Sequence, residues 1–277
     1  MFTVIGSNRV MGRFRLVMLA ALIAVTVAAS VRLVLVQQAA LARKRIGKPL
    51  GEESLDADRV WRGALDGEPL DLLMLGDSIA AGLGAERRKE TLGGRLAKAI
   101  GRRMHRPVRL RTAAVVGSES PDLPAQLDAL PTGYRPHVAV IVVGGNDVTH
   151  RLPVALSAQH LQETIRRLSA LGVEVVVGTC PDLGALRPVP QPLRRIASSL
   201  SRRLAEIQDE TARQAGAEAV DLRRAVGPMF FDEPETMFSL DRFHPSALGY
   251  RRTAEALTPA VCRAVERSLS SRRREPR

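Results

Sequence analysis

Short apolar runs alternate with longer amphipathic stretches from about residue 69 onward. The first run is too short for a typical helix and ends at Gly76, which indicates a buried strand. The runs lie at residues 70–75, 107–113, 137–143, 173–178 and 217–222. Helical spacing is found at about 90–104, 121–130, 157–171, 192–215 and 246–268. Strands that alternate with helices predict an α/β fold, with a parallel sheet covered by helices on both faces.

The N-terminal segment has a different pattern. Residues 1–15 are basic, whereas Leu16 to Val31 carries no charge and is almost wholly apolar. Counted through Val36, with only Arg32 interrupting it, this segment is long enough to cross a bilayer. A signal peptide cleaved near Ser30 is the alternative. Residues 1–36 are therefore expected to form a transmembrane segment or a signal peptide.

The charges around this segment give conflicting indications of orientation. More basic residues follow it than precede it, and the positive-inside rule would then keep the main domain in the cytoplasm. A basic start followed by an apolar core instead favours export. We expect association with the membrane through one N-terminal helix, or secretion after cleavage near Ser30, with an extracytoplasmic domain favoured.

The rest of the chain divides into three parts. Residues 37–68 are polar and contain several glycines, which is typical of a linker. Residues 69–269 carry the alternating pattern and form the predicted main domain. Residues 270–277 are rich in arginine and serine, and we expect a disordered basic tail there.

Composition narrows the classes of partner. Lys and Arg number 41 against 29 Asp and Glu, which gives a net charge of +12 and favours anionic surfaces. Aromatic residues make up only 3% of the chain, so the stacking platforms that bind single-stranded nucleic acid are scarce, and no nucleic-acid partner is expected. Cys180 and Cys262 form neither a disulfide scaffold nor a zinc cluster. A bond between them would fit only an oxidising compartment.

Four groups of small and polar residues stand out in the main domain. Gly76-Asp77-Ser78, with Gly82 after it, ends the first apolar run. Gly117 follows the second run, and Gly144-Gly145-Asn146-Asp147 follows the third. The fourth group, Asp241 to Pro245, precedes the last helix. The first three lie at C-terminal strand ends, which is the edge where open α/β sheets bind ligands.

The residue types in these groups suit acyl transfer. Ser78 would attack a carbonyl carbon, and His244 would accept its proton and pass it to the leaving alcohol. Asp241 lies three residues before His244 and can orient its imidazole. A tetrahedral oxyanion needs preorganised donors, which the N–H groups of Ser78 and Gly117 and the side-chain amide of Asn146 can supply.

Together the four groups resemble the four sequence blocks of the SGNH hydrolases, a branch of the GDSL esterase/lipase family. The resemblance spans residues 76–245 in the family's order. It implies a flavodoxin-like three-layer α/β/α fold with a parallel sheet of about five strands. It also implies ester hydrolysis without a metal or cofactor, a catalytic triad of Ser78, Asp241 and His244, and an oxyanion hole of Ser78, Gly117 and Asn146. The second block departs from the family pattern, because Val115 stands where many members have asparagine.

Other residues compete for these roles. Asp147 and His150 form a second D-x-x-H pair, also at a strand end. Cys180 follows the fourth strand, but no nearby pattern supports a thiol nucleophile, and a small buried hydrophobe is favoured. Asp77 is interpreted as a structural hydrogen-bonding residue. The proline-rich loop at 181–190 is expected to wall the substrate site, whereas the aromatic residues at 227–240 are assigned to core packing, with an acyl-chain pocket as the alternative.

The sequence therefore favours a membrane-tethered serine esterase or lipase that acts on a small-molecule acyl ester, with a monomeric catalytic domain. Transfer of an acyl group to a sugar hydroxyl by the same residues is a second hypothesis. A membrane-tethered binding domain without catalysis is a third, because a fold alone implies no function.

Overall fold

The computed structural model describes residues 5–274, with side chains from residue 15 onward. Its main domain is built on a six-stranded sheet in the order β1-β3-β2-β4-β5-β6. All neighbouring strands pair in parallel except β1, which is antiparallel to β3. The five parallel strands have a flavodoxin-like order, as predicted, and β1 adds a short edge that was not predicted. The strands are β1 (Val60–Trp61), β2 (Leu70–Gly76), β3 (Val108–Thr112), β4 (Val138–Val142), β5 (Glu174–Gly178) and β6 (Glu218–Val220).

The five helical stretches expected in the main domain are present, with ends that differ by a few residues. Between β3 and β4 the expected helix divides into the 3-10 turn η2 (Ser120–Asp122) and α4 (Leu123–Asp128). The α-helices are α1 (Ile5–Ile46), α2 (Ser78–Ala81), α3 (Leu92–Met104), α4, α5 (Gly145–His150), α6 (Val154–Ala170), α7 (Leu193–Gln214), α8 (Leu222–Ala225), α9 (Gly227–Asp232), α10 (Pro234–Met237) and α11 (Ala247–Arg272). Two further 3-10 turns are η1 (Arg88–Glu90) and η3 (Leu183–Ala185).

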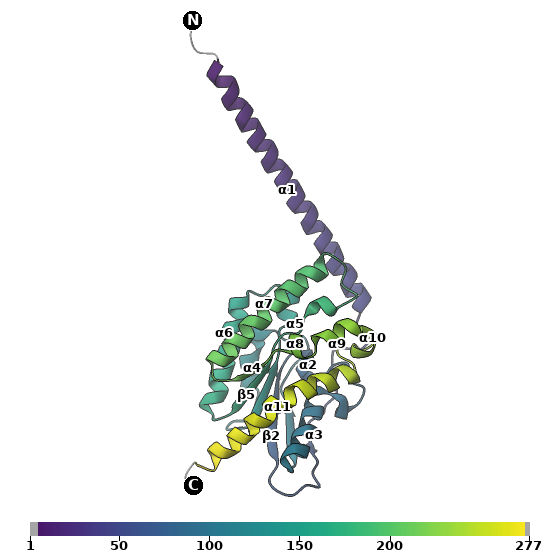
Figure 1. The fold of residues 1–277 in the computed structure, drawn as a ribbon, viewed down its shortest axis with the longest axis vertical. Helices are drawn as coiled ribbons and strands as arrows, with labels where there is room; N and C mark the ends of the chain where they lie inside the picture. Colours follow the sequence, from purple (N-terminus) through teal and green to yellow (C-terminus); the bar gives the residue numbers. More distant parts are fainter. Residues whose placement is uncertain (1–4, 275–277) are drawn as a thin grey trace.

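Two apolar layers enclose the sheet. Alternate residues of the central strand β4 point to opposite faces, so Val138, Val140 and Val142 join one cluster, whereas Ala139 and Ile141 join the other. The first cluster is completed by α3 and α11, and the second by α4, α6 and α7. Figure 1 shows these helices on the two sides of the strands. Burial on both faces explains why the central strand β4 is a continuous apolar run, whereas β3, next to the edge strand β1, alternates between buried and exposed residues.

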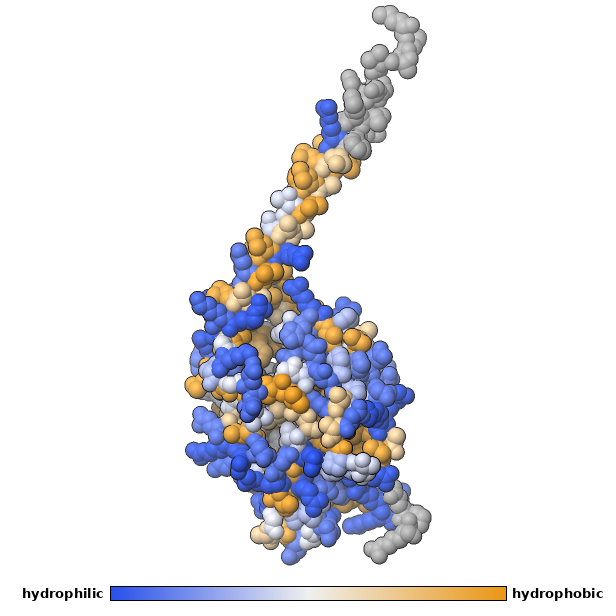
Figure 2. All heavy atoms as spheres, turned by 180° about the vertical axis from the view of Figure 1, so that it is seen from behind, coloured by the Kyte–Doolittle hydropathy of each residue, from blue (hydrophilic) through white to orange (hydrophobic). Residues whose placement is uncertain are grey.

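The N-terminal apolar helix α1 projects away from the domain (Figure 1). From residue 15 onward it is the one helix long and apolar enough to cross a membrane, and none of its apolar window is buried against the domain. Figure 2 shows apolar side chains along much of its exposed length. The predicted apolar segment was expected to end at Val36, but the helix continues ten residues further, to Ile46.

Parts of the expected linker and tail belong to the ordered domain. Ala57 is 4% exposed and packs in the core, while Asp58 Oδ2 accepts a hydrogen bond of 3.0 Å from the Thr112 backbone N–H. The stretch expected as a linker at 37–68 therefore contains the end of α1 and the edge strand β1, which pairs with β3. At the other end, α11 continues through Arg272, so a disordered tail does not begin at residue 270 as expected. Residues 275–277 lie outside the described chain.

Candidate active site

Ser78 lies at the sharp turn where β2 becomes α2. β2 ends at Gly76, Asp77 caps the helix through a 2.9 Å hydrogen bond from the Ile79 N–H to Asp77 Oδ1, and Ser78 is the first helical residue. Gly76 has φ +128°, and a Cβ there would lie 1.8 Å from the Val142 carbonyl oxygen. Only glycine fits this close approach of β2 to β4. The sequence Gly-Asp-Ser thus places a serine side chain at the C-terminal edge of the sheet.

A series of hydrogen bonds joins Ser78 to His244 and Asp241. His244 Nε2 lies 2.9 Å from Ser78 Oγ, and His244 Nδ1 lies 2.5 Å from Asp241 Oδ2. The other oxygen of Asp241 accepts hydrogen bonds from the backbone N–H groups of Phe243 (2.9 Å) and His244 (3.0 Å). Both oxygens of Asp241 therefore hold the same short segment that carries the imidazole, which fixes the ring between the two side chains.

These contacts decide the charge of Asp241. The side chain is 4% exposed, and burial acts to raise its pKa. The hydrogen bonds from the His244 ring and from the His244 and Phe243 backbone N–H groups outweigh burial and hold the pKa of Asp241 below its usual value. The carboxylate is therefore ionised at neutral pH, and the shared proton belongs on His244 Nδ1. That leaves Nε2 as an acceptor for the Ser78 hydroxyl.

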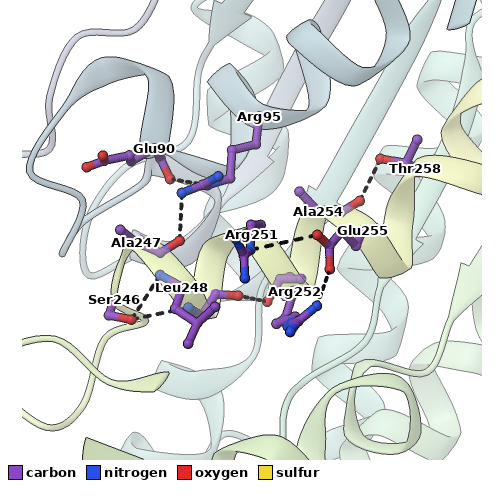
Figure 3. Close-up of polar contacts among 12 residues, drawn as sticks. Glu90, Arg95, Ser246, Ala247, Leu248, Arg251, Arg252, Ala254, Glu255 and Thr258 are labelled. Carbon is purple, nitrogen blue, oxygen red and sulfur yellow. Dashed lines mark hydrogen bonds and ion pairs between the residues drawn. The ribbon is translucent and has the colours of Figure 1, made fainter. Parts of the chain in front are cut away.

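The start of α11, drawn with Ser246 and Arg95 in Figure 3, directly follows the segment that carries His244. Ser246 caps this helix, because its Oγ accepts hydrogen bonds from the backbone N–H groups of Leu248 (3.1 Å) and Gly249 (3.2 Å). Arg95 of α3 donates from Nη2 to the Ala247 carbonyl oxygen at 2.7 Å. His244 thus lies just before a helix terminus, and that terminus is fixed to the core layer of α3 and α11.

Asn146 and Gly117 lie on neighbouring loops at the same sheet edge. Asn146 is the second residue of α5, and its Nδ2 donates to the Ser118 carbonyl oxygen at 2.9 Å, which leaves its second amide hydrogen free. Gly117 has φ +88°, with no atom within 4 Å of a Cβ built there. Within residues 5–274, neither the Ser78 nor the Gly117 backbone N–H has a hydrogen-bond acceptor. Asn146 lines the cavity beside Ser78, whereas Gly117 does not.

The second D-x-x-H pair does not form a unit. Both oxygens of the buried Asp147 bind Ser120, accepting its backbone N–H at 2.9 Å and its hydroxyl at 2.5 Å. His150 turns instead to Glu119, with Nδ1 2.5 Å from Oε1, and its side chain is 64% exposed. His244 rather than His150 is therefore the histidine that contacts Ser78.

Gln126 is a site residue that the sequence did not reveal. Its buried amide both accepts from the Gly76 N–H (2.9 Å) and donates to the Gly76 carbonyl (2.8 Å), and it also reaches Ser118 Oγ at 3.2 Å. It thereby joins the residue at the end of β2 to the loop that contains Gly117. A lone glutamine 50 residues from its partner has no local pattern that would identify it.

Burial is the main cause of the raised pKa values of Asp77 and Cys180. Burial raises the pKa of Asp77 to about 6, although its hydrogen bond from Ile79 and the charge of His244 lower it. Burial likewise raises the pKa of the Cys180 thiol well above its usual value, so this cysteine stays protonated and is a poor nucleophile. Cys180 and Cys262 are both buried free thiols.

An apolar cavity opens beside Ser78 and His244. The loop after β5 forms one side of it, as expected for residues 181–190. Phe230 and Phe238 contribute from the aromatic stretch, with ring centroids 4.9 Å apart in an edge-to-face arrangement. Among the described residues, no group of three or more His, Cys, Asp and Glu side chains has the arrangement of a metal site. The apolar lining residues include Leu183, Ala185, Leu186, Leu222, Val226, Phe230, Phe238 and Phe243.

Comparison with known proteins shows the family to which this chain belongs. Residues 74–252 match the GDSL-like lipase/acylhydrolase family. The chain belongs to this family. It is 40% identical to the GDSL-like esterase Rv1075c of Mycobacterium tuberculosis over 212 residues, which cover 76% of this chain and 67% of that protein. The GDSL-like domain is therefore a hydrolase that acts on ester bonds, as the sequence motifs predicted.

Solved structures support the fold of this GDSL-like hydrolase. A lipase/acylhydrolase from Enterococcus faecalis superposes with a TM-score of 0.55 at 19% identity, covering 70% of this chain and 95% of that one. TesA superposes with a TM-score of 0.56 at 26% identity, covering 70% and 99%. The three-layer SGNH hydrolase architecture predicted from the four blocks is confirmed.

The two histidines give a direct test of the site. Because His244 contacts Ser78 and His150 contacts Glu119, we expect His244→Ala to lower kcat for ester hydrolysis by about 10³-fold or more. His150→Ala is the matched control and should keep most of the wild-type kcat. Steady-state kinetics of both variants, with folding checked by circular dichroism, measure the difference. Equal losses in two folded variants would contradict the assignment.

Proposed function

We propose that this GDSL-like domain is a serine esterase in which Ser78, His244 and Asp241 form the catalytic triad. The proposal rests on one observation: the hydrogen bonds that run from Ser78 Oγ through both nitrogens of His244 to Asp241. This is the arrangement that activates a serine hydroxyl, because the base lies within reach of the nucleophile and is itself oriented by a carboxylate.

The reaction would proceed in two steps. Ser78 Oγ forms a bond to the acyl carbon while His244 Nε2 takes the hydroxyl proton. As the ester C–O bond breaks, the same proton passes to the departing alkoxide, and an acyl-serine remains. Water then attacks the acyl-serine with His244 again as the base, which releases the acid and restores the Ser78 hydroxyl. The ionised Asp241 stabilises the imidazolium that forms in each step.

The oxyanion would be held by donors on three segments. The backbone N–H groups of Ser78 and Gly117 have no acceptor within the described chain, and Asn146 has one free amide hydrogen. Asn146 lines the cavity with Ser78, which supports its part in the oxyanion hole. Gly117 has weaker support, because it adjoins Ser118 but does not line the cavity.

The apolar cavity beside Ser78 would receive the acyl group of the substrate. Its aromatic and aliphatic lining gives an acyl chain an environment better than water, at about 0.8 kcal/mol for each buried methylene. The exposed apolar helix α1 would tether the domain to a membrane. We therefore propose a membrane-tethered esterase whose substrate is a small-molecule ester with an apolar acyl chain.

Loss of the nucleophile tests the proposed function. Ser78→Ala should lower kcat for p-nitrophenyl ester hydrolysis by about 10³-fold or more while the fold survives, because the three residues act as a unit. Kinetics of the wild type and the variant, with thermal unfolding as the check on folding, measure this loss. A folded Ser78→Ala variant with full activity would exclude Ser78 as the nucleophile.

The oxyanion hole has a separate kinetic signature. Asn146→Ala should lower kcat by about 10²–10³-fold with little change in KM, because its hydrogen bond strengthens as negative charge develops in the transition state. Both kcat and KM of Asn146→Ala are measured in one substrate titration and compared with the wild-type values. A rise in KM with kcat unchanged would mean that Asn146 only binds the substrate.

A further inference from the structure

The C-terminal end of α1 is part of the catalytic domain. Gln38, Ala42 and Arg45 are spaced four and three residues apart, so they lie on one face of the helix. All three contact the domain, whereas the apolar window of the same helix has no buried residue. Figure 1 shows the end of α1 beside the start of α7. The helix is thus exposed along its apolar window, and it packs against the catalytic domain from Gln38 onward.

Gln38 makes the most specific of these contacts. Its Nε2 donates to the Gln191 carbonyl oxygen at 2.5 Å, and its Oε1 accepts from the Leu193 N–H at 3.0 Å. Leu193 is the first residue of α7, and Pro192 before it supplies no side-chain cap. The first N–H groups of a helix have no partner within the helix. Gln191 Oε1 accepts the Arg195 N–H at 3.2 Å, and Gln38 supplies from α1 the acceptor for the Leu193 N–H.

The same face of α1 packs against the loop that walls the cavity. Ala42 is 6% exposed and belongs to an apolar cluster with Leu183, Leu186 and Val189. Arg45 Nη1 donates to the Pro188 carbonyl oxygen at 3.3 Å. Leu183 and Leu186 also line the cavity. The loop after β5 is thus held between the end of α1 on one side and the cavity on the other.

We propose that Gln38 is a positioning residue for acyl-chain selectivity. By fixing the loop at Gln191 and Leu193, it holds the wall formed by Leu183 and Leu186 at the distance that accommodates an apolar chain. It does not touch the reacting atoms, which are held by β2, α2 and the start of α11. The inference rests on the proposed function, since it assumes that the acyl chain enters this cavity.

The test compares Gln38→Ala with Gln37→Ala in the full chain, in detergent micelles. Gln37 is the exposed neighbour on the same helix and has no side-chain hydrogen bond within the described residues, so it is the matched control. The substrates are p-nitrophenyl acetate and p-nitrophenyl octanoate. Because both variants are measured in the same micelles, partitioning of the longer ester cancels in the comparison.

Gln38→Ala should lower the octanoate-to-acetate ratio of kcat/KM about five- to tenfold, the effect of losing one or two hydrogen bonds of modest net strength. The change should appear in KM for octanoate, with kcat little affected, because the triad is not moved. Gln37→Ala should keep the wild-type ratio. If Gln38→Ala does not fold, Gln38→Glu keeps an acceptor for the Leu193 N–H but loses the bond to the Gln191 carbonyl, and it should raise KM for octanoate by a smaller factor.

Two results would contradict a positioning role for Gln38. An unchanged ratio in a folded Gln38→Ala variant, or an equal loss of kcat with both esters, would overturn the positioning role. Failure of the proposed function is distinguished by Ser78→Ala: if that variant hydrolyses acetate as the wild type does, the triad is wrong whatever Gln38 does. If hydrolysis depends on Ser78 and the ratio is unchanged in Gln38→Ala, only the inference about Gln38 fails.

Discussion

Parallel pairing of β2 with β3 and β4 is the constraint on which the site depends. The registers align Met74 with Thr112 and Gly76 with Val142, so the three strands end close together and pass directly into the loops of the site. Parallel strands need long crossovers, and for this reason residues that meet at this edge are far apart in the sequence. Ser78 and His244 are 166 residues apart and yet in hydrogen-bond contact.

Asp241 and Asp77, two buried carboxyl groups at this edge, have pKa values shifted in opposite directions because their partners differ. Asp241 has hydrogen bonds from a ring nitrogen and two backbone N–H groups, and these keep its pKa low despite burial. Asp77 is fully buried with fewer donors, and its pKa is raised to about 6. Its raised pKa means that the folded protein holds this proton more tightly than the unfolded chain, so ionising Asp77 costs stability as pH rises toward 6. The lowered pKa therefore keeps Asp241, behind His244, ionised to a lower pH than Asp77.

The sequence was most informative where a local pattern carries the structure. The pattern predicted all five parallel strands, and it is clearest in the inner strands β2, β4 and β5, which are almost wholly apolar because they are buried on both faces. The first, third and fourth motif groups also identified Ser78, Asn146 and His244, which line one cavity, whereas Gly117 of the second group does not line it. The edge strand β1 was missed, since two residues in a polar stretch give no periodicity. The pairing of His150 with Glu119, and the roles of Gln126 and Gln38, depend on contacts across distant segments that no local pattern encodes.

The central claim is that His244 makes Ser78 a nucleophile. It is tested most directly by reaction with a serine-reactive organophosphonate, followed by mass spectrometry of the digested chain. We predict one labelled peptide, modified at Ser78, in the wild type and in His150→Ala, and little or no label in His244→Ala, because His244 contacts Ser78 Oγ and is its proposed base. Label at another residue, or labelling of Ser78 at the wild-type rate in a folded His244→Ala variant, would contradict the account.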